Sequence, residues 1–311
     1  MTQYIIRRIL QAFLVMLGVT FLVFVVMYQA GDPVILMASP DATQEDIENL
    51  RRNLGLDRPW YIQYADFLGG AVQGDFGTSL RQGQPVFELV MQRIPATLAL
   101  ALSAFVFSVV VSIPVGVISA TKRNTLYDNF AMGFALLGQS LPVFFLGVML
   151  IWIFGFVLGW LPSSGRGDPD LVSRIRHLIL PAITLGTFSL AQNARLVRSS
   201  LLEVLGLDYV KTARSKGITE YNVIMRHALR NALIPVVTVI GLQFGILLGG
   251  AVITETVFAW PGIGRLLIQA IQQQDFPLAV GAVTIIALIF VFLNLLVDLT
   301  YGFLDPRVRY S

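Results

Sequence analysis

The sequence of 311 residues contains no cysteine and little charge. The absence of cysteine excludes a disulfide framework, a thiolate metal site and a cysteine nucleophile. Charged residues make up 13% of the chain, against about 25% in an average soluble domain. Because 55% of the residues are hydrophobic and the mean hydropathy is +0.72, the composition predicts an integral membrane protein.

Residues that carry enzyme chemistry are also scarce. The sequence has no GxxxxGK[ST] phosphate loop and no HExxH motif. The topology predicted below places His177 and His227 on opposite sides of the membrane, so they cannot share a metal ion. Glu255 and Asp298 lie near the ends of apolar segments, whereas a proton-coupled transporter needs deeper acids. We therefore predict no catalytic residue, cofactor site or metal site in this chain. A net charge of +3 spread over apolar segments predicts no nucleic-acid partner either.

Six apolar segments of about 20 residues are each long enough to cross a bilayer. They lie near 9–28, 96–119, 130–157, 180–200, 232–254 and 280–303. The pattern predicts an all-α, polytopic membrane protein with six transmembrane helices. In this prediction 1–30 form the N-terminus and first span, 31–95 an extracytoplasmic loop, and 96–311 the core membrane domain, which includes a cytoplasmic loop at 201–231.

Basic residues indicate the orientation, because they accumulate on the cytoplasmic side of membrane proteins. If the six spans alternate, one side receives all three lysines and most arginines outside the loop at 31–95. These residues are Arg7, Arg8, Lys122, Arg123, the cluster at 195–230, Arg307 and Arg309. Both termini are therefore predicted to be cytoplasmic.

The predicted outer loop contains signals for two short amphipathic helices. The first would begin at Ser39 and Pro40 and end at Gly55. The second would begin at Asp57 with Pro59 and end at Gly69–Gly70. Such helices could form a lid or a docking surface, or could be a cap packed on the spans.

Two spans carry candidates for the lining of a transport pathway. Polar residues of the fourth span share one helical sector, which predicts a face toward protein or a watery cavity, with interhelical hydrogen bonding as the alternative. Small residues recur at every fourth position of the fifth span and permit close approach of another helix. The candidates are Thr184, Thr187, Gln192, Gly241, Gln243, Gly245 and Gly249.

The segment DYVKTARSKGITEYNVIMRHALRN at 208–231 carries seven charged residues. Burying them in lipid would cost on the order of 20 kcal/mol, at ~3 kcal/mol each, so the segment is predicted to lie outside the bilayer. Asp208 is predicted to cap a helix that runs through Lys216, and Gly217 to end it with a left-handed turn. Thr219 would cap a second helix.

The second helix of this segment is predicted to present one apolar stripe. The stripe comprises Tyr221, Ile224, Met225 and Ala228. A positive-inside signal or a helix lying on anionic lipid would explain the charge, but neither requires a glycine turn between two helices. The order of features favours a docking hairpin for a cytoplasmic protein.

This segment resembles the cytoplasmic loop of ABC importer permeases. Their signature runs EAA, three residues, Gly, nine residues and then I-x-L-P. In this chain 211–213 stand at the EAA positions, Gly217 at the glycine and 227–230 at I-x-L-P. The glutamate, the isoleucine and the proline of the signature are missing here. DYVKTARSKG followed by RHALRNALIPVVT is similar to the dipeptide, oligopeptide, glutathione and nickel branch. Further resemblance runs along the chain in LGLDRPWYIQY, GDFGTS, RIPATL, LPAITLG, ARLVRSSLLEVL, GGAVITETVFAWPGIGRLL and NLLVDLTYGFLDPRVR.

The resemblance implies a type I ABC importer permease of the bacterial inner membrane, of the first-permease type. It implies pairing with a second permease, docking of two cytoplasmic ATPases that bind ATP and Mg²⁺, and delivery of substrate by an extracytoplasmic binding protein. The implied ATPase-coupling residues are Asp208, Ala213, Gly217, Tyr221, Ile224, Met225, Arg226 and Ala228.

Peptides are the commonest cargo in this branch, and glutathione or a nickel chelate are the alternatives. From other classes, a self-contained secondary transporter or channel, or a receptor that uses the outer loop, would need no ATPase. The lack of deep acids and of detectable inverted repeats argues against a secondary transporter. Glycine and proline in several spans suit moving helices better than a static receptor.

Overall fold

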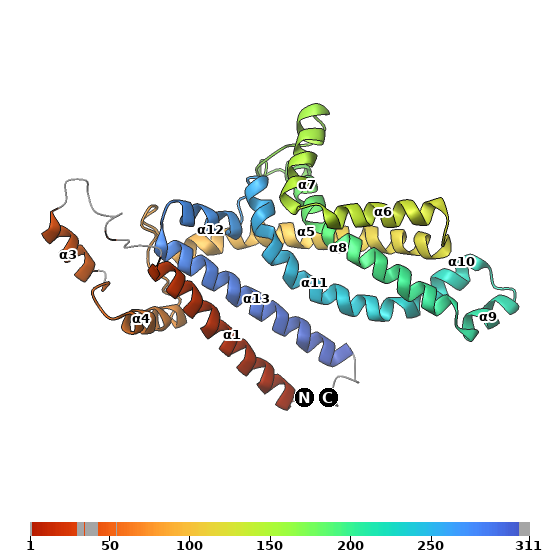
Figure 1. The fold of residues 1–311 in the computed structure, drawn as a ribbon, viewed down its shortest axis with the longest axis horizontal. Coiled ribbons are helices and arrows are strands. Elements are labelled where there is room, and N and C mark those ends of the chain that lie inside the picture. Colours follow the sequence, from red (N-terminus) through yellow and green to blue (C-terminus); the bar gives the residue numbers. More distant parts are fainter. Residues whose placement is uncertain (1, 30–33, 35–42, 54, 305–311) are drawn as a thin grey trace. The chain divides into compact units, whose positions relative to one another are not determined.

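The computed structural model describes residues 2–29, 34, 43–53 and 55–304, and these residues contain helices and no β-strand (Figure 1). The predicted all-α fold is therefore confirmed. The helices are α1 (Thr2–Gln29), α3 (Gln44–Asn53), α4 (Trp60–Val72), α5 (Val86–Thr121), α6 (Leu126–Ser140), α7 (Val143–Leu150), η1 (Ile151–Val157), α8 (Leu171–Leu205), α9 (Asp208–Ser215), α10 (Glu220–Asn222), η2 (Val223–Ala228), α11 (Leu229–Val257), α12 (Ile263–Gln272) and α13 (Phe276–Leu304), where η marks a π-helical segment.

The chain divides into two compact units, Met1–Ala96 with Pro261–Ser311, and Thr97–Trp260. In the first unit α1 packs along α13, and the start of α5 packs against α12 and α13. This unit has a large apolar cluster. It contains Phe76, Val86, Leu89, Val90, Ile263, Leu266, Ala270, Leu278, Ala279, Ala282 and Ile285.

A buried carboxylate pins the loop before α5 to the turn between α12 and α13. Asp275 is fully buried and accepts a hydrogen bond of 2.5 Å from Ser79 Oγ. The same carboxylate accepts from the backbone N–H of Leu80 at 3.1 Å and from that of Leu278, in the first turn of α13, at 3.3 Å. Each N–H would otherwise lack a partner, so Asp275 caps α13 while it fixes a segment distant in sequence.

The first short helix of the predicted outer loop is α3. The Thr43 hydroxyl accepts from the Asp46 backbone N–H at 3.3 Å, and the Asp46 carboxylate accepts from the Thr43 N–H at 3.0 Å, a reciprocal cap. Gly55 has a φ of +68° and follows the helix end, as predicted. The predicted start at Ser39 and Pro40 lies outside the described residues.

The second short helix, α4, begins after Pro59 as predicted but does not end at Gly69–Gly70. It continues to Val72, and the left-handed turn comes at Gly74, whose φ is +79°. A Cβ on Gly70 would lie 2.7 Å from the carbonyl oxygen of Asp75. Gly70 therefore permits the chain to fold back over the helix and does not terminate it.

Four described helical segments are long and apolar enough to span a membrane, or five if a bent pair counts as one span. They are Ile9–Val26, Val86–Thr121, Glu220–Gly241 and Phe276–Leu293, with the bent pair Leu126–Ser140 and Val143–Val157. α5 begins ten residues before the predicted start at 96, inside the predicted loop. The number of six crossings stays a prediction.

The third predicted span, 130–157, is broken into two helices. α6 and the α7–η1 segment meet at 109°. Leu141, between them, is extended, with φ −79° and ψ 132°. The following Pro142 disfavours a helical conformation at Leu141, so the apolar run cannot continue as one helix.

The fourth predicted span is part of α8, which is long enough to cross a membrane but is not among these apolar segments. Its polar residues lower the mean hydropathy, but several face inward: Thr184 and Asn193 are each 1% exposed. Helices α6, α7 and α11 all pack on α8 within the second unit. α8 is therefore a central helix of that unit. Of its predicted polar face, Thr184 is buried and Thr187 and Gln192 are half-buried, whereas Arg195 is exposed.

Glycines permit the close packing of α5 on α8. A Cβ on Gly186 would lie 2.6 Å from the carbonyl oxygen of Ala104, and one on Gly116 would lie 2.6 Å from Val197 Cβ. Real Cβ atoms are not found at such separations from other atoms. The two helices consequently have no room for a methyl group at either position.

We expect Gly186→Ala to destabilise the protein by about 1–3 kcal/mol, because the backbone of α5 must move away. The matched control is Gly133→Ala on α6, where an added Cβ meets nothing within 4 Å and alanine improves helix propensity by about 1 kcal/mol. Melting followed by intrinsic tryptophan fluorescence in detergent measures both. A Gly186→Ala protein that melts no lower than the control would contradict this packing.

Candidate functional site

The segment predicted to dock a partner forms a helical hairpin at one end of the second unit (Figure 1). α8 ends at Leu205, a short turn leads into α9, and a second turn leads into α10. The helical path then continues without a break through η2 into α11. We call Leu207–Asn231 the coupling hairpin.

The predicted cap at Asp208 is wrong in detail. Leu207 holds the N-cap position of α9, and Asp208 is the first helical residue. The Asp208 carboxylate instead pairs with Lys211 Nζ at 2.8 Å. Its negative charge still lies in the first turn, where it complements the helix dipole.

Gly217 makes the predicted left-handed turn, with a φ of +75°. Its N–H donates to the carbonyl of Arg214 at 3.0 Å, and α9 ends at Ser215. A Cβ at Gly217 would meet nothing within 4 Å, so the need for glycine comes from the backbone conformation alone. Thr219 holds the predicted N-cap position of α10, without a side-chain hydrogen bond.

A small apolar core joins the two arms of the coupling hairpin to the end of α8. Val210 and Val223 are fully buried and Ala213 is 7% exposed. Val204 and Leu205 of α8 pack against this cluster. Because a fully buried valine contributes roughly 1.5–3 kcal/mol, this core attaches the hairpin to α8.

Polar contacts brace the coupling hairpin at both ends. Asn231 Nδ2 donates to the Tyr209 hydroxyl at 2.8 Å, and that hydroxyl donates to the His227 carbonyl at 3.3 Å. Near the turn, Arg214 donates to both carboxylate oxygens of Glu220, at 3.1 and 2.7 Å, which raises the pKa of Arg214 above its ordinary value. The Arg214 and Glu220 side chains are 41% and 57% exposed. Exposed pairs contribute about 1 kcal/mol or less, so the apolar core matters more.

The predicted apolar stripe is corrected at Ala228. Residues 223–228 form a π-helix, whose wider turn removes the regular helical spacing that the stripe assumed. Ala228 is fully buried against Leu201 and Ala232, whereas Tyr221 and Met225 are 72% and 40% exposed. Ile224 is partly buried. Tyr221 and Met225 therefore form the outer apolar surface of the hairpin.

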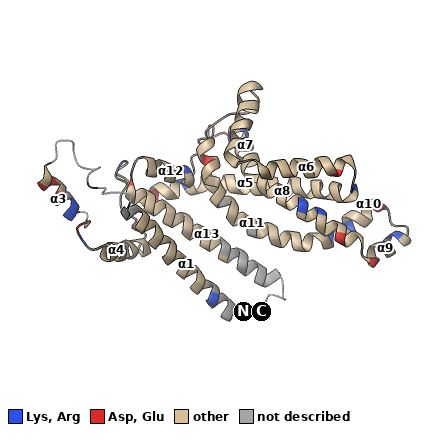
Figure 2. Cartoon of the chain, in the orientation of Figure 1, with Lys and Arg blue, Asp and Glu red and all other residues tan. Residues whose placement is uncertain are grey.

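Exposed basic residues surround these two apolar side chains in the chain. Figure 2 shows charged residues on α9 and α10, whereas most of α11 is uncharged. The exposed basic residues of the coupling hairpin are Lys211, Arg214, Lys216, Arg226 and Arg230. Lys211 and Arg214 pair with the exposed acids Asp208 and Glu220, so the hairpin offers both apolar and charged surface to a partner.

The predicted pathway threonines pack against other helices of the second unit. A Cβ on Gly138 of α6 would lie 2.6 Å from Thr187 Cγ2. One on Gly147 of α7 would lie 3.3 Å from Thr184 Cγ2. The Thr184 and Thr187 hydroxyls donate to carbonyls one turn earlier in α8. Both residues thus contact the bent α6–α7 pair, and their part in a pathway stays a prediction.

Two other pathway candidates contact each other. Gln243 Nε2 of α11 donates to Gln192 Oε1 of α8 at 3.2 Å. Gln243 is 6% exposed, and its Oε1 has no hydrogen-bond partner.

The three candidate glycines of α11 differ in exposure. Gly245 is buried and Gly241 half-buried, whereas Gly249 is exposed and an added Cβ there meets nothing within 4 Å. This face of α11 leaves space for a neighbouring helix at Gly249.

Glu255 is fully buried near the end of α11. Its Oε1 accepts a hydrogen bond of 2.6 Å from Thr97 Oγ1 of α5. Glu255 is thus a buried acid with a hydrogen-bond partner on a neighbouring helix. The Asp298 side chain is outside the described set, and within that set no three His, Asp or Glu side chains converge as metal ligands.

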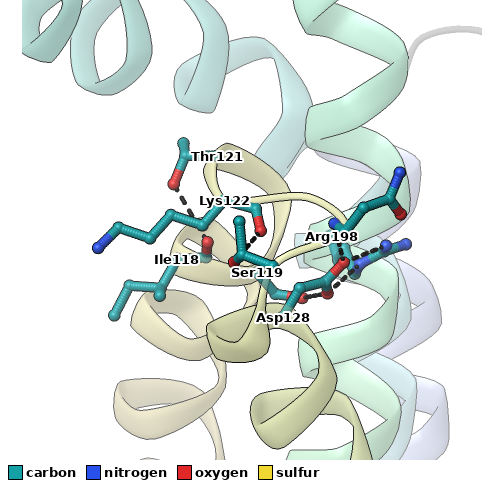
Figure 3. Close-up of polar contacts among 8 residues, drawn as sticks. Ile118, Ser119, Thr121, Lys122, Asp128 and Arg198 are labelled. Atoms are coloured by element: carbon teal, nitrogen blue, oxygen red, sulfur yellow. Dashed lines mark hydrogen bonds and ion pairs between the residues drawn. The ribbon is translucent and has the colours of Figure 1, made fainter.

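A buried ion pair was missed by the sequence reasoning. Asp128, at the start of α6, accepts two hydrogen bonds from Arg198 of α8, at 2.9 and 2.8 Å (Figure 3). Ser119 Oγ of α5 and the Asn124 backbone N–H also donate to this carboxylate. The Asp128 side chain is 4% exposed and that of Arg198 26%. The sequence did contain a signal for this pair: Asp128 and Arg198 lie at the same end of the third and fourth predicted spans, where an acid and a base can pair.

The described chain thus combines apolar helices long enough to cross a membrane with an exposed polar hairpin between α8 and α11. The chain belongs to the family described as binding-protein-dependent transport system inner membrane component, whose model matches residues 112–310. The corresponding N-terminal family model matches residues 1–101. It is thus a multi-pass inner-membrane transport subunit of a bacterial ABC importer and not an enzyme, as predicted.

Curated relatives match the whole chain. It is 43% identical over 338 residues to the dipeptide transport system permease protein DppB of Escherichia coli (strain K12). It is 42% identical over 316 residues to the oligopeptide transport system permease protein AppB of Bacillus subtilis (strain 168). Both alignments cover 100% of this chain and 100% of the relative.

Solved structures share the fold at low sequence identity. A chain of the MetNI methionine ABC transporter in an inward-facing conformation matches with a TM-score of 0.56 and 20% identity, over 70% of this chain and 96% of that one. A chain of an amino acid ABC transporter with histidines matches with a TM-score of 0.52 and 16% identity, over 68% and 92%. These structures support the permease fold.

Proposed function

We propose that this chain is a permease subunit of an ATP-driven importer of dipeptides or oligopeptides and forms half of the pathway through the membrane. The coupling hairpin is the observation that carries the proposal. Its first arm, α9, lies outside the segments apolar enough to span a membrane, a buried core ties it to α8, and Tyr221 and Met225 are exposed to a partner. Full-length relatives named for dipeptide and oligopeptide transport support peptides as the cargo.

The proposed complex contains a second, homologous permease, two ATPases and an extracytoplasmic binding protein. The chain itself has no phosphate-binding loop, so ATP and Mg²⁺ would bind to the ATPases. The basic coupling hairpin would face the cytoplasm, in accordance with the positive-inside rule. Tyr221 and Met225 would enter a groove on one ATPase, and exposed basic residues of the hairpin such as Lys216 and Arg226 would face acidic residues there.

In the proposed mechanism, closure of the ATPases on ATP displaces the coupling hairpin and shifts the permease between inward and outward access. ATP can shift this equilibrium only by the difference in free energy between the docked states. A flexible hairpin would change its own conformation when the ATPases close and would not transmit the movement to the membrane helices. The core of Val210, Ala213 and Val223 and the turn at Gly217 keep the hairpin rigid.

Purification from native membranes with a tag on this chain tests the proposal. We expect two ATPases and a second permease to copurify, and we expect dipeptides or oligopeptides with the binding protein to raise the ATPase rate in proteoliposomes. Stimulation by glutathione or a nickel chelate but not by peptides would correct the cargo. A chain that purifies alone and still transports would overturn the proposal in favour of a secondary transporter or channel.

A further inference from the structure

The buried Asp128 carboxylate connects three elements of the second unit. It accepts from Ser119 near the end of α5, from the Asn124 N–H in the connection to α6, and from the guanidinium of Arg198 on α8 (Figure 3). We propose that the Asp128–Arg198 ion pair is a positioning element that carries movement of the coupling hairpin to α6. This inference rests on the proposed ATP-driven function.

Arg198 is rigidly connected to the coupling hairpin. It lies about two helical turns before the end of α8. Beyond it, Leu201 belongs to a buried cluster with Ala228, and Val204 and Leu205 pack on the hairpin core. A displacement of the hairpin must therefore displace Arg198.

Asp128 is the contact through which α6 can follow that displacement. Asp128 and Ala135 are the buried residues of α6, and its neighbours Leu126, Tyr127 and Phe130 are between 63% and 76% exposed. The first turn of α6 is therefore attached to the unit mainly through the carboxylate. Two parallel hydrogen bonds to a planar guanidinium fix direction as well as distance, which a single contact does not.

Movement of α6 would reach the bent pair it forms with α7. The bend at Leu141–Pro142 follows α6 directly. Beside it, Thr187 and Thr184 of α8 lie against Gly138 and Gly147. These two threonines are candidates for the pathway lining. The ion pair is thus placed to couple the position of the coupling hairpin to the positions of the helices around Thr184 and Thr187.

Charge-neutral variants in the reconstituted complex separate positioning from folding. The variants are Asp128→Asn, Arg198→Gln and the double variant, with Arg123→Gln as a control that removes one exposed charge from the adjacent connection. Each single variant leaves one charge unpaired, so both singles should melt lower than wild type. The double variant removes both charges and should regain most of the lost melting temperature.

The decisive measurement is peptide transported per ATP hydrolysed. We expect this ratio to fall at least about fivefold in the double variant, with ATPase binding retained, and to remain at the wild-type value in Arg123→Gln. A double variant that regains both melting temperature and transport ratio would make the pair purely structural and overturn the inference. If wild-type complex shows no ATP-dependent peptide transport, the proposed function fails and the inference with it.

The cysteine-free chain also permits a direct test of position. Spin labels at Phe134→Cys of α6 and Ser215→Cys of α9 would lie on exposed sites of the two elements. We expect their separation to stay constant when ATP binds to wild type and to change in the double variant. A separation that changes equally in both would show that α6 does not follow the hairpin through the ion pair.

Discussion

Tyr221→Asp is expected to release the ATPases from this permease. Tyr221 is the most exposed apolar residue of the coupling hairpin, at 72%, and tyrosine is enriched among residues that dominate interface energy. A charge there would have to be desolvated in an apolar groove. We expect the substitution to reduce the binding free energy between permease and ATPase by about 2 kcal/mol or more, which weakens ATPase binding at least about 30-fold. Retention of ATPases during purification of the tagged permease measures the effect.

The matched control is Tyr61→Asp. Tyr61 is 57% exposed on α4, in the segment predicted to lie on the opposite side of the membrane. The Tyr61→Asp substitution introduces the same charge at a tyrosine of similar exposure but away from the predicted ATPase surface. ATPase retention should therefore remain at the wild-type level. If Tyr221→Asp retains the ATPases as well as Tyr61→Asp does, the docking surface is not at Tyr221.

Gly217→Val is expected to impair coupling while leaving insertion into the membrane intact. Gly217 has a φ of +75°, where a residue with a Cβ incurs a penalty of about 1–2 kcal/mol. The hairpin would relax into another turn and move α9 relative to α10. This energy corresponds to about 5- to 30-fold in the population of the native turn. Transport and binding-protein-stimulated ATPase activity should fall accordingly.

Gly217→Asn provides the control, because asparagine adopts the left-handed conformation more readily than valine. An added Cβ meets nothing within 4 Å at this position, so both variants place their Cβ in open space and differ chiefly in how readily they adopt the left-handed conformation. Stimulation of the ATPase in proteoliposomes is the measurement. Equal stimulation in wild type and Gly217→Val would show that the turn has no role in coupling.

Features set by local chemistry could be predicted from the sequence. The charges at 208–231 cannot enter lipid at any reasonable cost, and Gly217 is the residue type that permits a left-handed helix end. The sequence therefore predicted a helical hairpin with its turn in the observed place. Apolar length likewise predicted membrane helices, since about 20 apolar residues are needed to cross a bilayer.

Features set by contacts between distant residues could not be predicted in the same way. Gly70 is a site of close approach rather than a helix end because the chain folds back to bring the Asp75 carbonyl to it. Ala228 leaves the exposed stripe because η2 is a π-helix packed on α8. A glycine can end a helix or permit close approach of another segment, and an alanine can be exposed or buried. Neighbouring residues decide which of these occurs.

The sequence by itself determined that this chain is a helical membrane protein with a polar hairpin between apolar segments, because solvation and backbone preference act residue by residue. Only the tertiary structure decided which side chains of that hairpin face outward. It also brought together Asp128 and Arg198, which are 70 positions apart in the chain. A buried charge is tolerated only beside its partner, and the packing of α6 on α8 supplies that partner.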